Sequence, residues 1–88
     1  MKKNLLNYRI LVEKEKTKNG YVYVSYVPSL GISDFGKNVD EAVKNTEKAI
    51  KIYLETLVEL KNDIPEMDAE EYFVVNKQVK FNTPIAIA

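Results

Sequence analysis

Cysteine, histidine and tryptophan are all missing from the 88-residue sequence. Without cysteine there is neither a disulfide framework nor a thiolate metal site. Without histidine, only carboxylates, hydroxyls and amines are left for catalysis. No apolar run approaches the roughly 20 residues of a membrane span, and the basic start is not followed by the apolar stretch of a signal peptide. We therefore expect a cytoplasmic protein.

A surplus of positive charge is also missing, because 13 Lys and Arg residues balance 13 Asp and Glu residues. Surfaces that bind nucleic acid use a basic surplus or a basic face to contact phosphates, so this balance argues against a dedicated nucleic-acid binder. The composition, with 45% apolar and 30% charged residues, is ordinary for one small globular domain. We expect a single domain over residues 1–88, with a core over 5–62 and a strand-containing tail over 63–88.

Two strands and a hairpin are expected near the N-terminus. Alternating apolar residues predict a strand over 5–15, and the β-branched and aromatic residues of 21–27 predict a second one. Two registers fit the polar turn between them. A two-residue Asn19-Gly20 turn would pair Val12 with Val27. A three-residue loop with Gly20 in the left-handed conformation would instead gather the apolar side chains on one face, and we favour it for that reason. That face would hold Tyr8, Ile10, Val12, Val22, Val24 and Tyr26.

One long helix should follow a short third strand over about 31–35. Asn38 has the character of an N-cap, and Glu41 three residues later completes a capping box. Apolar residues then recur at a spacing of three and four as far as about Lys61. At least one strand is expected after the helix, around 72–75. The sequence therefore predicts an α+β domain with a three-stranded antiparallel sheet and one helix on one face. Its core should contain Ile10, Val12, Val22, Val24, Val43, Ile50, Leu54 and Leu57.

A single helix leaves the second face of the sheet open. In the favoured register this face is apolar and bears tyrosines, which usually marks a contact with another chain. The alternative is that the tail folds back over it within the monomer. We expect a homodimer or higher homo-oligomer, with a tail strand exchanged between protomers as one way to form it. The expected interface residues are Leu11, Tyr21, Tyr23, Val27, Val79 and Phe81.

No constellation of residues indicates an enzyme. Glu13, Glu15 and Asp34 are better explained as solvated carboxylates, and the acidic segment 63–71 does not have the spacing of a calcium loop. The serines have neither a histidine to activate them nor a nucleophile elbow around them. We therefore expect no catalytic, cofactor-binding or metal-binding residues.

An alternative function is an RNA- or nucleotide-binding module, because tyrosines interleaved with lysines resemble a stacking platform for single strands. These residues are Tyr21, Tyr23, Tyr26, Lys14, Lys16 and Lys18.

Residues 20 to about 57 resemble the HicB family of antitoxins. The similarity lies in the order of several elements: Tyr26-Val27-Pro28-Ser29-Leu30, then Gly31, then Gly36, then Asp40-Glu41-Ala42 at the start of a helix. The helix ending Ala49-Ile50-Lys51-Ile52-Tyr53-Leu54 and the following Asp63-Ile64-Pro65-Glu66 are also in the family style. Ser29 stands where the family usually has Asp, and a family proline between Leu30 and Gly31 is missing.

The resemblance implies a β-β-β-α-β partial ribonuclease-H-like fold without the nuclease carboxylates. It also implies an antitoxin that covers the active site of a small RNA-cleaving HicA toxin. Many relatives continue into a ribbon-helix-helix or helix-turn-helix module that binds DNA, whereas this sequence ends at Ala88. We therefore expect no specific DNA binding by this chain alone.

Overall fold

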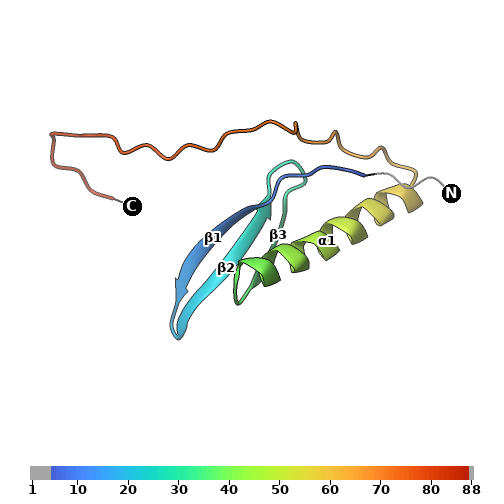
Figure 1. The fold of residues 1–88 in the computed structure, drawn as a ribbon, viewed down its shortest axis with the longest axis horizontal. Coiled ribbons are helices and arrows are strands. Elements are labelled where there is room, and N and C mark those ends of the chain that lie inside the picture. Colours follow the sequence, from blue (N-terminus) through green and yellow to red (C-terminus); the bar gives the residue numbers. More distant parts are fainter. Residues whose placement is uncertain (1–4, 88) are drawn as a thin grey trace.

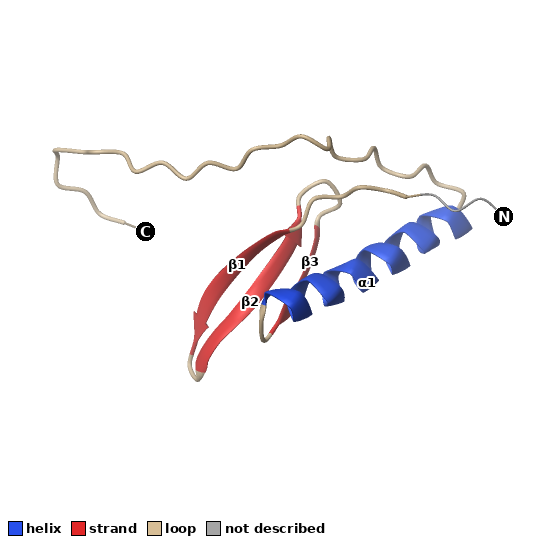
Figure 2. Ribbon diagram, viewed as in Figure 1, coloured by secondary structure: helices blue, strands red, loops and turns tan. Residues whose placement is uncertain are grey.

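The computed structural model describes residues 5–87 as an α+β fold. Three strands, β1 (Leu11–Thr17), β2 (Gly20–Val27) and β3 (Ile32–Gly36), form an antiparallel sheet in the order β1-β2-β3. The helix α1 (Val39–Glu59) then lies along one face of the sheet, packed mainly on β3 and β2 (Figures 1 and 2). The predicted class, with three antiparallel strands and one long helix, is confirmed. No helix in the described part of the chain is long and apolar enough to span a membrane.

The two ends of α1 have distinct caps. At the start, the side chain of Asn38 accepts a hydrogen bond from the backbone N–H of Glu41 (2.8 Å), which confirms the expected N-cap. At the end, Asn62 N–H donates to the carbonyl of Leu57 (2.9 Å) and Lys61 N–H donates to that of Val58 (3.0 Å). This is a Schellman motif, with Lys61 in the left-handed position at φ 58°. The helix thus ends at Glu59 rather than at Lys61.

The hairpin register differs from both registers considered from the sequence. Thr17 pairs with Gly20, so the two-residue turn is Lys18-Asn19, and Gly20 takes its positive φ of 138° just after it. Val12 consequently lies opposite Ser25. Because side chains alternate along a strand, this register places Val12 on the same face as Val27 and away from Val22 and Val24.

The helix-covered face of the sheet is built around small residues. Ser25 lies in the middle of β2, with its hydroxyl in contact with the Thr46 hydroxyl and 3.2 Å from the carbonyl oxygen of Ala42. Ser25, Val27, Ala42 and Thr46 are completely buried. A Cβ at Gly36 would lie 2.8 Å from the carbonyl carbon of Glu41 and closer still to Ala42 N. Glycine is therefore what allows the first turn of α1 to approach β3 so closely.

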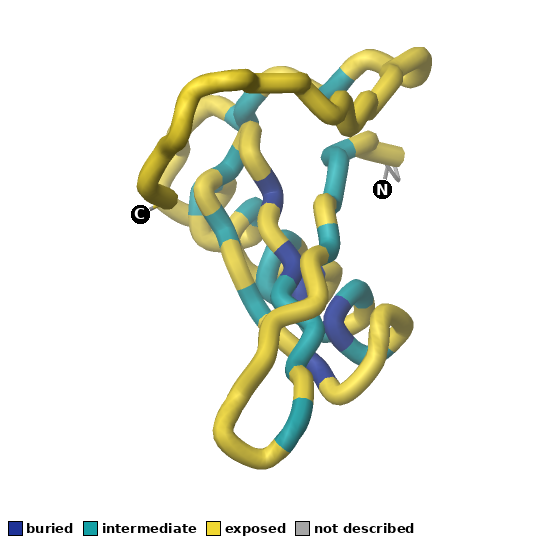
Figure 3. Tube along the Cα trace, turned by 90° about the vertical axis from the view of Figure 1, so that its left-hand side faces the viewer, coloured by how far each residue is buried: buried dark blue, intermediate teal, exposed yellow. Residues whose placement is uncertain are grey.

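The core of the single chain is thin. Val27 and Ala42 are the completely buried apolar residues among those described, and Figure 3 shows how few positions are buried along the trace. The prediction that Val22 and Val24 belong to the core under α1 is wrong, because the observed register turns both toward the open face. The other predicted core residues are half-buried: Ile10, Val12, Val43, Ile50, Leu54 and Leu57.

The predicted C-terminal strand is also absent within the described residues, because residues 62–87 contain no helix or strand. The segment is extended, passes the end of the sheet and then continues beyond it (Figure 1). A strand needs a neighbouring strand to satisfy its backbone hydrogen bonds, and this segment has no such neighbour in the part of the chain that the structure describes. The radius of gyration is accordingly 17.1 Å, whereas a compact domain of this length would have about 12 Å.

Candidate interaction surface

The face of the sheet opposite α1 carries an apolar strip that crosses all three strands. Leu11 of β1 pairs with Tyr26 of β2, and Val24 of β2 pairs with Phe35 of β3. The exposed fractions are 38% for Leu11, 45% for Tyr26 and 63% for Phe35. We call Leu11, Val24, Tyr26 and Phe35 the open face. Its width over three strands distinguishes it from isolated exposed apolar residues, which are normal on protein surfaces.

Three of the six residues predicted for an interface lie on the other side of the sheet. Val27 is completely buried under α1 and is unavailable to a partner. Tyr23 lies on the helix side and is half-buried. Tyr21 is on the same side but near the hairpin end, where it is exposed, with the Lys14 ammonium 4.1 Å from the centre of its ring. The sequence-based face assignment of these three residues is therefore corrected.

The remaining three predicted interface residues are exposed away from the helix. Leu11 belongs to the open face, and Val79 and Phe81 lie in the extended C-terminal segment. Reasoning from the sequence missed Val24, Tyr26 and Phe35. The signal that identifies them is Ser25, because a small hydroxyl side chain in the middle of a strand fits against the small Ala42 and Thr46 of the helix. That placement turns its strand neighbours, Val24 and Tyr26, outward.

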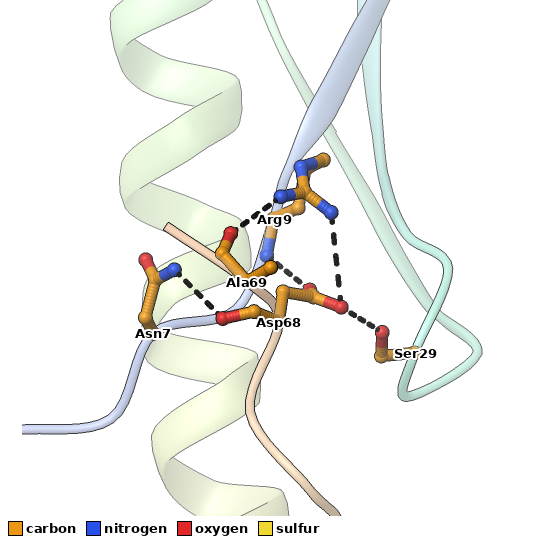
Figure 4. A network of polar contacts seen from close by, with 5 residues as sticks. All are labelled: Asn7, Arg9, Ser29, Asp68 and Ala69. Carbon is orange, nitrogen blue, oxygen red and sulfur yellow. Dashed lines mark hydrogen bonds and ion pairs between the residues drawn. The ribbon is translucent and has the colours of Figure 1, made fainter. Parts of the chain in front are cut away.

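A cluster of polar contacts fixes the start of the C-terminal segment to the sheet (Figure 4). The carboxylate of Asp68 accepts hydrogen bonds from the backbone N–H of Arg9 (2.7 Å) and from the Ser29 hydroxyl, and it lies 3.8 Å from the Arg9 guanidinium. Arg9 also donates to the carbonyl of Ala69 (2.8 Å), and Asp68 N–H donates to the carbonyl of Asn7 (2.9 Å). We call Arg9, Ser29 and Asp68 the clasp.

The electrostatics of the clasp favour an ionised Asp68. Hydrogen bonds from the Arg9 N–H and then from the Ser29 hydroxyl lower the pKa of the Asp68 carboxyl. Desolvation opposes them, and the Arg9 charge adds a lowering effect that is smaller than the effect of desolvation. Partial desolvation and the nearby Asp68 charge raise the pKa of the Tyr8 hydroxyl, which donates to the carbonyl of Pro65. Because the single arginine of the chain is held here, it is not free to reach a phosphate.

Beyond the clasp, the chain passes the open face without packing on it. The Arg9 guanidinium lies 3.1 Å from the centre of the Tyr72 ring. A hollow of about 460 Å³ then separates the segment from the sheet. Val74 and Asn76 line it on the side of the segment, and on the side of the sheet it is lined by Leu11, Val12, Glu13, Val24 and Tyr26. The tail therefore does not cover the open face of its own chain.

The candidate carboxylates do not converge. Glu13 lies opposite Val24 on the open-face side of the sheet, and Glu15 follows it on the same side. Asp34 lies opposite Ser25 on the helix side, where its carboxylate accepts a hydrogen bond from Phe35 N–H (2.8 Å). Within residues 5–87, no group of three His, Cys, Asp or Glu side chains is arranged to hold a metal ion.

The tyrosines do not form one stacking platform. Tyr21 and Tyr23 point to the helix side of β2, whereas Tyr26 points to the open face. Single-stranded nucleic acid is bound by aromatic rings that follow one another along one groove. The observed distribution over two faces does not favour that mode.

Comparison with known proteins identifies one family. A family model described as a HicB-like antitoxin of bacterial toxin–antitoxin systems matches residues 8–87. A UPF0150 protein of Synechocystis sp. is 33% identical over 67 residues, which cover 75% of this chain and 81% of the relative. A UPF0150 protein of Thermoplasma acidophilum is 37% identical over 70 residues, which cover 78% of this chain and 97% of the relative. No solved structure matches.

Proposed function

The chain belongs to the HicB-like antitoxin family, and we propose that it binds and neutralises a small RNA-cleaving toxin of the HicA type. The observation that carries the proposal is the family match over residues 8–87, which includes the sheet, the helix and the C-terminal segment. An antitoxin implies a toxin partner. In the proposal, the chain covers the active site of the toxin and so keeps RNA away from it.

The surface of the molecule supports inhibition by contact. An inhibitor of this kind needs a complementary surface and no chemistry of its own, which agrees with carboxylates that lie on different faces of the sheet. The chain exposes large apolar side chains on the open face, on the outer side of α1 and along the C-terminal segment. Exposed apolar surface of this extent is typical of protein–protein contacts. In this proposal the protein inhibits the toxin by contact and without catalysis. It acts in the cytoplasm, where an RNA-cleaving toxin would meet its substrate.

We also propose that the antitoxin works as a homodimer or higher homo-oligomer. The support is the thin core of the single chain, in which few apolar residues are completely buried. Small domains without disulfides or metals commonly gain their missing stability by association. Leu11, Val79 and Phe81 remain proposed contact residues, because each is exposed and lies away from α1.

Binding to the toxin distinguishes this function from nucleic-acid binding. The probe is the small basic protein expected from the neighbouring reading frame, titrated with the full chain by calorimetry at low and at high salt. We expect a stable complex whose affinity changes little with salt. The proposal would be contradicted if the isolated chain had no affinity for the basic protein but bound RNA with an affinity that falls steeply with salt. That result would favour the RNA-binding alternative.

A further inference from the structure

We propose that residues 72–87, which we call the arm, dock on the open face of a second copy of this chain. The arm of one copy enters the hollow that lies, in the second copy, between the sheet and the arm of that second copy. The arm follows directly on the clasp, and the open face consists of Leu11, Val24, Tyr26 and Phe35. This docking takes place in the isolated antitoxin and therefore does not depend on toxin binding.

The first support is the area left exposed. The chain has 8271 Å² of accessible surface, about 3,000 Å² more than the roughly 5,300 Å² of a compact monomer of its mass. A stable interface of standard size buries about 800 Å² on each partner. The excess is therefore large enough to supply a full interface, and the arm contributes to it, because its described residues are all exposed.

The second support is the character of the arm itself. Its apolar residues are at least half exposed, and its β-branched and aromatic composition is typical of a strand. These residues are Tyr72, Phe73, Val74, Val75, Val79, Phe81, Ile85 and Ile87. An unpaired segment of this kind is prone to pair with another chain. The arm contains no glycine with which to return tightly on itself.

The third support is the hollow of about 460 Å³ between the open face and the start of the arm. The clasp holds the chain at Asp68, and Arg9 lies over the Tyr72 ring, so the root of the arm is fixed at a distance from its own sheet. The chain therefore presents a slot lined by apolar side chains together with Glu13 and Asn76, and an apolar segment that does not fill it.

A second copy is the occupant that satisfies both features at once. In a two-fold exchange, each arm meets an open face and each open face receives an arm, so that neither of these two apolar surfaces is left uncovered. The zero net charge means that two copies do not repel one another overall. A different partner would have to recognise the face and the arm separately.

Sedimentation equilibrium of the full chain at micromolar concentration tests the assembly. We expect twice the 10.1 kDa of one chain. Phe81→Gln should weaken the dimer at least about tenfold, or ~1.4 kcal/mol. Ile52→Gln on α1 is the matched control, because Ile52 is 65% exposed and Phe81 is 64% exposed, and it should leave the mass unchanged. Circular dichroism should show the same helix content in both variants.

Cross-linking tests the geometry, because the chain has no cysteine of its own. A Tyr26→Cys chain is mixed with a Phe81→Cys chain and treated with a short bismaleimide, and we expect a cross-linked pair of unlike chains. Ile52→Cys mixed with Tyr26→Cys should give none. Three results would each overturn the proposal. The parent could sediment with the mass of a single chain, or cross-links could form only between two Phe81→Cys chains. The arm could also become protected from proteolysis only after a toxin is added.

Discussion

Replacing Gly36 with alanine places a methyl group where the first turn of α1 meets β3. The added Cβ would lie 2.8 Å from the carbonyl carbon and 2.9 Å from the Cβ of Glu41, and nearer still to Ala42 N. These neighbours belong mostly to the backbone of a capped helix, so they cannot move aside as a flexible side chain does. The helix start has to move away from the sheet.

The expected cost follows from two effects. Overpacking of a close contact costs about 1–3 kcal/mol. Displacement of the helix also weakens the contacts of Ser25 with Ala42 and Thr46, worth about 1 kcal/mol for each hydrogen bond. We expect a total of about 2–4 kcal/mol, which is a large part of the roughly 4–13 kcal/mol available to a domain of 88 residues.

Urea unfolding followed by circular dichroism measures this loss. The control is Gly31→Ala, because a Cβ at Gly31 meets nothing within 4 Å but must adopt a φ of 68°. That variant isolates backbone strain, expected at about 1–2 kcal/mol. If Gly36→Ala unfolds at the same urea concentration as the parent or as Gly31→Ala, the close approach of α1 to β3 is refuted.

Further predictions concern the clasp and DNA. Because the pKa of Asp68 is lowered in the fold, the clasp should be fully formed above the ordinary value of about 3.9 and should be lost as the pH falls through the lowered value. The amide shift of Arg9 should therefore titrate below that ordinary value in the parent and not at all in Asp68→Asn, and a midpoint above it would contradict the assignment. The isolated chain should not bind its own promoter selectively in an anisotropy titration near physiological salt, because Arg9 is held in the clasp and the segment after Pro65 has more acidic than basic residues. Nanomolar, sequence-selective binding would refute this.

The helix was the most predictable element because its signals are local. Asn38 and Glu41 satisfy backbone groups within the first turn, so the start could be located from the sequence alone. The end was placed two residues late because Lys61 adopts a left-handed conformation that favours glycine, and nothing in the identity of a lysine indicates this.

The faces of β2 could not be assigned from alternation. Apolar or aromatic residues occur on both sides of this strand, so shifting the register exchanges two faces of nearly equal hydrophobicity. The deciding residue was Ser25, whose small side chain fits under the helix, and small residues carry little weight in a hydrophobic pattern. The prediction of the interface was wrong about the face of the sheet for Tyr21, Tyr23 and Val27 for the same reason.

The C-terminal strand illustrates a different limit. Residues 72–75 have the composition of a strand, which is why the sequence predicts one there. A strand forms only when a neighbour accepts its backbone hydrogen bonds, and no such neighbour is present among residues 5–87 of the single chain. The composition of a segment indicates its preference for the strand conformation, but it does not indicate whether a neighbouring strand is available.

Inhibition of RNA cleavage tests the proposed antitoxin function most directly. The small basic toxin expected from the neighbouring reading frame is held at a fixed concentration with a labelled RNA, and the full chain is added in steps. The account predicts that cleavage falls linearly and stops at a fixed stoichiometric ratio, with Gly36→Ala less effective at temperatures where it is partly unfolded. Undiminished cleavage in the presence of a molar excess of folded chain would contradict it.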